Sequence, residues 1–271
     1  MLVVTLLNQK GGVGKTTCTH HLSGALAGPL GRRVLVVDAD PQASLSQGWF
    51  GPAGTRAMPP EETIAEIFAG RLPYPDQVIR PTPLAGVSIL PGSRAAAEWN
   101  DSRPLLLPRE SRESLRDFLA QVEDDFDIVL VDPPPNLYGA SFAALAASDA
   151  LLVPLQPEDY GAQGIADVLD SLDAVRGEGY PVELLGYLLT MVAPARALHR
   201  EYEASLRAAY GEQVFAARLP MRPEFPEAVA HRKTVHQYKP KSAAAKAVLA
   251  VAEELLARAA GTSPIAEGVA A

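Results

Sequence analysis

Cysteine is almost absent from the sequence. The 271 residues include one cysteine, Cys18, which follows a glycine-rich segment. A single cysteine excludes a disulfide framework within the chain and any metal cluster held by several thiolates of one chain. We therefore expect Cys18 to pack in the core rather than to act in catalysis, and we expect a reducing, cytoplasmic setting.

Long apolar runs are also missing. No stretch reaches the roughly 18 apolar residues that a membrane-spanning helix needs, and no basic segment followed by an apolar one opens the sequence as a signal peptide would. The region Ala247–Arg258 contains acids and few bulky apolar residues, so it is poorly suited to lie on a membrane surface. We expect no stable membrane association.

The overall composition is that of a globular protein. Hydrophobic residues make up 48% of the chain and charged residues 21%, with a formal net charge of −8. This balance favours a packed core over disorder. The length suits one large α/β domain without an obvious linker, which we place at residues 1–260, and we expect residues 261–271 to form a disordered tail.

Apolar runs and helical patterns alternate along most of the chain. This alternation predicts parallel βαβ units, and hence an α/β fold with a doubly wound, mostly parallel sheet and helices on both faces. We expect a loop at residues 51–60 and irregular structure at residues 72–83, where glycine or proline recurs. The expected strands are Leu2–Leu7, Val34–Val37, Val87–Leu90, Phe126–Asp132, Ala150–Pro157, Leu184–Met191 and Val214–Pro220. The expected helices are Cys18–Ala27, Thr63–Phe68, Leu115–Val122, Asp159–Leu172, Leu198–Tyr210 and Ser242–Ala260.

The segment Asn8–Thr17 has the composition of a phosphate-binding loop. It lies between the apolar run Leu2–Leu7 and a helical segment, which is the strand–loop–helix setting that such loops require. Glycines allow consecutive backbone N–H groups to turn towards an anion, and the following helix adds the positive end of its dipole. Lys15 would reach the β- and γ-phosphates, and the Thr16 hydroxyl would bind Mg²⁺. The alternative is a glycine-rich turn with solvated lysines.

A second lysine distinguishes this loop from the general pattern G-x-x-x-x-G-K-[ST]. The first glycine of that pattern is replaced by Gln9, and Lys10 lies five residues before Lys15. A tight loop around one triphosphate already has its lysine in Lys15. We therefore expect Lys10 to point elsewhere, towards a nucleotide held by another copy of the chain.

These residues carry a resemblance to a known family. The run Lys10, Gly11, Gly12, Val13, Gly14, Lys15, Thr16 and Thr17 resembles the deviant Walker A loop of the ParA/MinD family of ATPases. The resemblance implies a P-loop NTPase fold in which these eight residues bind ATP with Mg²⁺, and hydrolysis of ATP by water to ADP and phosphate. It also implies an ATP-dependent sandwich homodimer in which Lys10 completes the partner's site.

Two acids follow the second apolar run, in the segment Asp38-Ala39-Asp40-Pro41-Gln42. The period of an extended chain puts Asp38 and Asp40 on the same side, and ligands of open α/β sheets gather at the carboxyl ends of strands. The two carboxylates are therefore candidates for contact with Mg²⁺-bound water and for positioning the attacking water. The alternative is an Asx-type turn with solvated carboxylates. The segment is similar to a ParA-type motif, which implies that Asp40 aligns the hydrolytic water and that Asp38 supports it.

A third acid, Asp132, ends the apolar strand that begins at Phe126, as the acid of a Walker B strand does. Asp132 would hold Mg²⁺ through water, whereas the alternative is an acid in a strand-terminal turn. The prolines 133–135 that follow form a stiff loop that is able to transmit γ-phosphate occupancy as a unit. This stretch resembles the switch region of the same family, although Pro135 departs from the commoner small or polar residue.

Positive charge gathers in the carboxyl-terminal third. No Asp or Glu occurs between Ala228 and Ala252, whereas that interval contains Arg232, Lys233, Lys239, Lys241 and Lys246. Such a distribution is a plausible footprint for DNA phosphates, and the alternative is a set of solvated helix faces. ParA proteins bind DNA without sequence preference through this region. The resemblance adds Arg196 and Arg222 to Arg232 and Lys233 of the basic interval, which makes four DNA-binding candidates.

The function that these features predict is a ParA-type ATPase for DNA segregation, associated with the nucleoid. The expected partners are a second copy of the chain, non-specific double-stranded DNA, and a ParB-like centromere-bound protein that stimulates hydrolysis. One alternative is a positioning ATPase for another cargo, such as a microcompartment or protein cluster. The other is a membrane-surface ATPase of the MinD kind. No helix-turn-helix extension precedes the loop, so sequence-specific operator binding is not expected.

Overall fold

The structure, a computed structural model, describes residues 1–157 and 161–261. Among these residues, a seven-stranded sheet forms the centre of the fold. The strand order is β3-β4-β2-β5-β1-β6-β7, and all neighbours are parallel except β3 and β4. The strands are β1 (Leu2–Leu6), β2 (Val34–Asp38), β3 (Arg80–Pro81), β4 (Val87–Leu90), β5 (Ile128–Asp132), β6 (Ala150–Leu155) and β7 (Glu183–Leu189). The mostly parallel, doubly wound sheet predicted from the sequence is confirmed.

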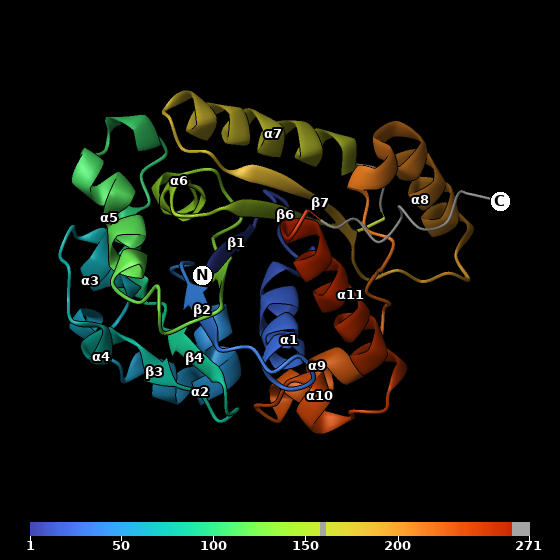
Figure 1. The fold of residues 1–271 in the computed structure, drawn as a ribbon, viewed down its shortest axis with the longest axis horizontal. Helices are drawn as coiled ribbons and strands as arrows, with labels where there is room; N and C mark the ends of the chain where they lie inside the picture. Colours follow the sequence, from blue (N-terminus) through green and yellow to red (C-terminus); the bar gives the residue numbers. More distant parts are fainter. Residues whose placement is uncertain (158–160, 262–271) are drawn as a thin grey trace.

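Helices cover both faces of the sheet (Figure 1). They are α1 (Lys15–Ala27), α2 (Ser44–Arg56), α3 (Ile64–Phe68), α4 (Pro75–Val78), α5 (Arg109–Ala120), α6 (Gly139–Ala146), α7 (Gly161–Gly177), α8 (Ala197–Tyr210), α9 (Glu224–Ala230), α10 (Val235–Tyr238) and α11 (Ala243–Ala259). Helices α1, α2, α9, α10 and α11 pack on one face, and α3, α5, α6, α7 and α8 pack on the other. Short 3₁₀ turns occupy Pro60–Glu62, Arg94–Trp99, Pro104–Leu106 and Gly211–Gln213.

The inner strands are buried on both faces. Every residue of β2, β5 and β6 is buried, as is β1 after Leu2. Val, Ile and Leu dominate these strands, and such near-continuous apolar runs are typical of parallel strands covered by helices on both sides. Because the strands are parallel, their carboxyl ends meet at one edge of the sheet, and the loops that follow β1, β2 and β5 lie next to one another there.

Three expectations differ from the structure. The loop expected at residues 51–60 is wrong for its first half, because α2 continues to Arg56 through a break at Gly51, whose φ is 76° and ψ is 164°. The strand expected at Val214–Pro220 forms only isolated bridges, from Val214 to Tyr187 and from Pro220 to Val192. Within residues 72–83, expected to be irregular, the chain forms α4 and the short antiparallel strand β3.

Two expectations touch parts of the chain that the structure does not describe. Asp159, the expected start of a helix, lies outside the described residues, and α7 is described from Gly161 onwards. Of the tail expected at residues 261–271, only Gly261 is among the described residues.

Candidate functional site

The glycine-rich loop connects β1 to α1 and ends at a glycine with left-handed geometry. Gly14, the residue before α1, has φ 89° and ψ 20°, and Gly12 has φ 81°. Residues other than glycine rarely adopt these backbone angles, so both positions require glycine. Gly11 and Gly12 are exposed, and a Cβ on either would meet no atom within 4 Å, so space for a ligand exists above the loop. Val13 is buried and anchors the loop from below.

Asn8 braces the loop, a role that the sequence did not reveal. Its side-chain oxygen accepts a hydrogen bond from the Lys10 backbone N–H at 2.9 Å, and its amide donates to the Pro154 carbonyl at the end of β6 at 2.8 Å. Asn8 is buried, and its bond to Pro154 is shielded from water. The start of the loop is therefore tied to the neighbouring strand.

Lys15 folds back over the loop that precedes it. Its Nζ donates to the Asn8 carbonyl at 3.0 Å and to the Lys10 carbonyl at 3.4 Å, and its side chain is buried. Burial lowers the pKa of the amine, while the negative charges of Asp132 and Asp40 act in the opposite direction. The amine thus lies at the centre of the loop, near two of the predicted acids.

Asp38 is held by a hydrogen-bond network that links three segments. Its Oδ2 accepts from the backbone N–H and from the hydroxyl of Ser46, both at 2.7 Å, and the Ser46 hydroxyl accepts from the Gly92 N–H at 2.8 Å. Gly92 must be small, because a Cβ there would lie 2.7 Å from the Asp38 carboxyl carbon. Burial raises the pKa of Asp38 to about 7, although the bonds from Ser46 act to lower it. Ser46 and Gly92 were not predicted as site residues.

Asp132 is the register partner of Asp38 across strands β5 and β2. Neither of its carboxylate oxygens has a hydrogen-bond partner among the described residues, and Asp38 Oδ1 is likewise buried without one. Burial raises the pKa of Asp132 well above its usual range and the charge of Asp38 adds to this, while the Thr16 hydroxyl and the Lys15 charge oppose it. Mg²⁺ prefers carboxylate and hydroxyl oxygens and retains water, so Thr16, Asp38 and Asp132 suit this ion.

Asp40 lies at the edge of the site and is half-exposed. Its Oδ1 accepts from the Gln42 backbone N–H at 2.8 Å, so the Asx-type turn considered above is present. A carboxylate accepts several hydrogen bonds, so this turn leaves capacity for a water molecule. Strand β2 ends at Asp38, and Pro41, which follows Asp40, is buried.

A pocket of about 450 Å³ opens beside the loop, and no sequence pattern predicted it. Gly14, Thr17 and Cys18 form one side of the pocket. The other sides come from segments that are distant in the sequence, and their lining residues are Thr190, Met191, Leu219, Pro220, Met221, Arg222, Phe225, Pro226 and Val229. The Thr190 hydroxyl donates to the Val13 carbonyl at 2.8 Å, which joins the pocket directly to the loop.

Cys18 is buried at the floor of this region, as expected for a core residue. Burial raises the pKa of its thiol to about 12, and the negative charge of Asp132 contributes. The thiol therefore stays protonated at neutral pH, which makes it a poor nucleophile.

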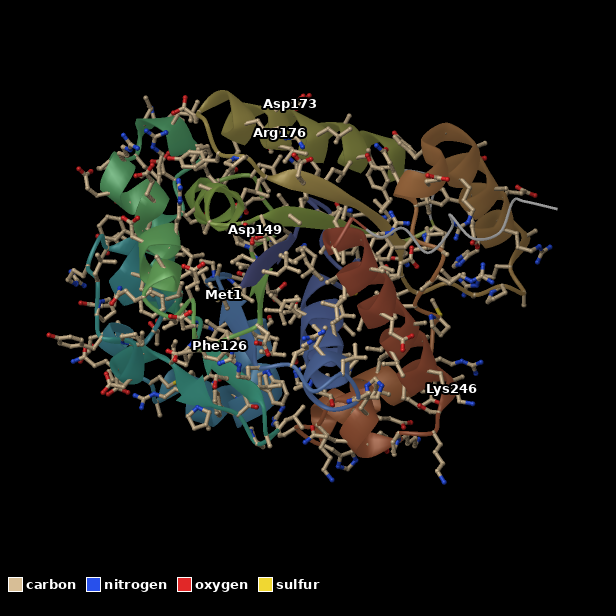
Figure 2. All side chains as sticks on the ribbon, viewed as in Figure 1. Met1, Phe126, Asp149, Asp173, Arg176 and Lys246 are labelled. Atoms are coloured by element: carbon tan, nitrogen blue, oxygen red, sulfur yellow. The ribbon has the colours of Figure 1, made fainter. Side chains whose placement is uncertain are left out.

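The four DNA-binding candidates lie on the side of the molecule formed by α8 to α11. Arg196, Arg222 and Lys233 are exposed, whereas Arg232 is half-buried. Lys246, labelled in Figure 2, is exposed on α11 on the same side. Within residues 1–157 and 161–261, no helix combines the length and apolar character needed to cross a bilayer.

The chain is similar to known proteins over most of its length. A family model described as an AAA domain matches residues 1–181. The chromosome-partitioning ATPase Soj of Thermus thermophilus is 38% identical over 260 residues, covering 94% of this chain and 95% of that protein. The chromosome partitioning protein ParA of Caulobacter vibrioides is 34% identical over 261 residues, covering 94% of each.

A solved structure extends the similarity to three dimensions. Cobyrinic acid a,c-diamide synthase from Mycobacterium smegmatis, with a bound ATP analog and magnesium, is 27% identical and superimposes with a TM-score of 0.78 over 96% of both chains. Because the family model spans most of the chain and relatives above 30% identity span nearly all of it, the chain belongs to the AAA-domain family of P-loop ATPases, among the ParA/Soj-type partition ATPases.

Proposed function

We propose that the protein is a Mg²⁺-dependent ATP hydrolase that acts in DNA segregation as a nucleotide-dependent dimer. One observation carries the proposal most strongly. The Lys15 amine and the carboxylates of Asp38 and Asp132 lie at one edge of the sheet, below an exposed loop shaped by Gly12 and Gly14. This is the arrangement that phosphoryl transfer needs, because that reaction depends on positioning and charge neutralisation rather than on a covalent nucleophile.

Different residues of the loop and of the adjacent strand ends bind the phosphates, the metal and the attacking water. The N–H groups of residues 11–17 and the Lys15 amine bind the phosphate oxygens, while Thr16 and Asp132 hold the metal, supported by Asp38. Bound Mg²⁺ supplies charge neutralisation at the phosphates. Asp40 orients the attacking water from the edge of the site. The relative with a bound ATP analog and magnesium supports ATP and Mg²⁺ as the ligands of the site.

The pocket beside Gly14 is the proposed site for the nucleoside. It begins at the loop, it is lined mainly by apolar side chains such as Met191 and Phe225, and its size suits an aromatic base with its sugar. The lining residues come from the segments after β7 and from α9, so a bound nucleoside would touch elements far from the phosphates.

The dimer is proposed from Lys10. Lys10 is half-exposed, whereas Lys15 is buried. A lysine that completes the partner's site makes dimerisation and nucleotide occupancy one equilibrium. The names of the Soj and ParA relatives support a role in partition, and the exposed Arg196, Arg222 and Lys233 support binding of DNA phosphates.

We further propose that residues 1–260 act as one ATPase domain, that the protein associates with the nucleoid, and that a ParB-like protein stimulates its hydrolysis. A positioning ATPase for another cargo would use the same chemistry and the same DNA face. A MinD-like membrane role finds no support in the terminal helix α11, which carries Glu253 and Glu254 near its end.

The test compares two lysine variants of the loop. Lys15→Ala should lose nucleotide binding in calorimetry, whereas Lys10→Ala should bind ATP but fail to dimerise in light scattering with Mg²⁺ and ATP. A DNA mobility shift with ATP, with ADP and without nucleotide completes the test, because only the ATP form should bind. Retained ATP-dependent dimerisation by Lys15→Ala, or equal DNA binding in all three states, would refute the proposal. Vesicle flotation with ATP tests the membrane alternative.

A further inference from the structure

The segment formed by α9 and α10, residues 224–238, contacts the candidate nucleotide site from the outside. Phe225 and Val229 of this segment line the pocket beside the loop. The segment is also fastened to α1, the helix that begins at Lys15. His20 Nε2 donates to the Lys233 carbonyl at 3.1 Å, and the Val235 N–H donates to His21 Nδ1 at 3.0 Å. The α9–α10 segment is thus packed against the helix that follows the loop.

Arg232 lies between α9 and α10 and has an unusual backbone conformation. Its φ is 57°, and the bonds from Arg232 N to the Val229 carbonyl and from Lys233 N to the Ala228 carbonyl close the end of α9 around it. Glycine normally occupies such a left-handed position at a helix end. An arginine held there is a departure that calls for a compensating role of its side chain.

The side chain of Arg232 reaches α2 rather than solvent. Its Nη1 donates to the Gln47 carbonyl at 3.0 Å, and its guanidinium packs against Gly51 at the break in α2. A Cβ at Gly51 would lie 3.3 Å from Arg232 Nη2, so the glycine leaves room for the guanidinium. Arg232 therefore joins α2 to the α9–α10 segment.

The same series of hydrogen bonds continues to the acid that is proposed to orient water. The Gln47 side-chain amide donates to the Gln42 carbonyl at 2.8 Å, and the Gln42 N–H donates to Asp40 Oδ1 at 2.8 Å. Asp40, Gln42, Gln47 and Arg232 thus form one continuous chain of contacts. It runs from the edge of the nucleotide site to the residue that precedes the exposed Lys233.

We propose that Arg232 is a positioning residue that couples the Asp40–Gln42 loop to the α9–α10 segment, and that it is not itself a contact to DNA phosphate. The inference rests on the proposed function and deepens it. When nucleotide binding moves Asp40, the movement is transmitted through Gln42 and Gln47 to Arg232. The guanidinium then sets how the α9–α10 segment presents Lys233 to DNA, together with Arg222, which lies two residues before the segment.

The first experiment compares two neighbouring variants that each remove one positive charge, Arg232→Gln and Lys233→Gln. DNA affinity is measured against salt concentration, with ATP and with ADP. A lost phosphate contact lowers the slope of log affinity against log salt by about 1. We expect this loss in Lys233→Gln only. In Arg232→Gln the slope should stay at the wild-type value, while the ratio of affinities with ATP and ADP falls at least about fivefold.

Two further variants separate coupling from misfolding. Arg232→Gly suits the left-handed backbone and removes the whole side chain with its guanidinium, so it should fold and show the same loss of the ATP-to-ADP ratio. Gln47→Met breaks the next contact in the chain. Because both act through one series of contacts, the double variant should lose no more than either single variant. Additive losses, or a fall of the salt slope in Arg232→Gln, would overturn the inference.

A readout without DNA keeps this inference distinct from the proposed function. Hydrogen exchange is followed in residues 8–17 and 224–238 before and after addition of Mg²⁺ and a non-hydrolysable ATP analogue. In the wild type both segments should gain protection, whereas in Arg232→Gly only residues 8–17 should. Equal responses of residues 224–238 in the two proteins, or no response in the wild type, would refute the coupling. Absence of DNA binding by the wild type would refute only the proposed function.

Discussion

Asp38 and Asp132 face each other as register partners on the parallel strands β2 and β5, and both are buried. Three of their four carboxylate oxygens have no hydrogen-bond partner among the residues that the structure describes. Two buried carboxylates in adjacent positions cannot both carry charge without a proton or a cation between them. The ligand-free protein therefore stores a pH-dependent repulsion at the place where we expect Mg²⁺.

Replacing Asp38 with asparagine should stabilise the ligand-free protein at high pH. The pKa of Asp38 is about 7 in the folded state and near 3.8 in the unfolded chain. The folded state thus holds the proton more tightly, and the free energy of unfolding falls as the pH rises from about 4 to about 7. Asp38→Asn abolishes this fall. Relative to wild type, its free energy of unfolding should rise by on the order of 3 kcal/mol between pH 5 and pH 8 in urea titrations. A pH-independent difference would contradict this.

Ser46 should be needed for stability through its hydroxyl. The hydroxyl donates to Asp38 and accepts from the Gly92 N–H, so Ser46→Ala leaves both buried groups with one partner fewer. We expect a loss of about 1–3 kcal/mol in the free energy of unfolding. Ser46→Thr keeps the hydroxyl and serves as the control. If Ser46→Ala unfolds at the wild-type urea concentration, the network does not contribute.

Acid should destabilise the protein through His20. Burial lowers the pKa of its imidazole to about 4, although the bond to the Lys233 carbonyl acts to raise it. The unfolded chain, with a pKa near 6.5, binds protons more readily, so the free energy of unfolding falls as the pH decreases from about 6.5 to about 4. His20 should contribute about 2 kcal/mol of loss between pH 7 and pH 5. Urea titrations of His20→Gln should show a loss smaller by that amount.

A methyl group at Gly24 should destabilise α1 against the α9–α10 segment. A Cβ there would lie 2.4 Å from Thr234 Oγ1 and 2.5 Å from Thr234 Cβ, so Gly24→Ala forces the two elements apart. Alanine favours a helix by about 1 kcal/mol, but the overlap should dominate and lower the free energy of unfolding by about 2 kcal/mol. Gly177→Ala, where a Cβ meets nothing within 4 Å, is the matched control. Equal thermal midpoints for the two variants would contradict the prediction.

Sequence patterns predicted the parts of the site that depend on local order. The apolar strands ending in Asp38 and Asp132 were recognisable from their composition, and parallel pairing alone brings the two acids together. The break in α2 shows the limit of this reasoning. Gly51 and Pro52 are residues typical of loops, but the burial of Leu45 and Trp49 keeps α2 packed on the sheet on the amino-terminal side of the break.

Contacts between distant segments were beyond prediction. Ser46 lies eight residues after Asp38, and no periodicity indicates that its hydroxyl bonds to that acid. The pocket beside the loop is assembled from Thr17, Met191 and Phe225, which three separate elements bring together. Arg232 was expected on the DNA face because of its charge. Its contact with α2 depends on a left-handed backbone conformation, which an arginine in the sequence does not predict.

The buried position of Cys18 has a practical consequence for following the protein by fluorescence. Its thiol is shielded and has a pKa near 12, so maleimide dyes should not react with it in the folded chain. A cysteine introduced at an exposed site away from the DNA-binding candidates would then take a single dye without removal of the native residue. Imaging of individual labelled molecules on DNA-coated surfaces would then test the proposed DNA binding directly.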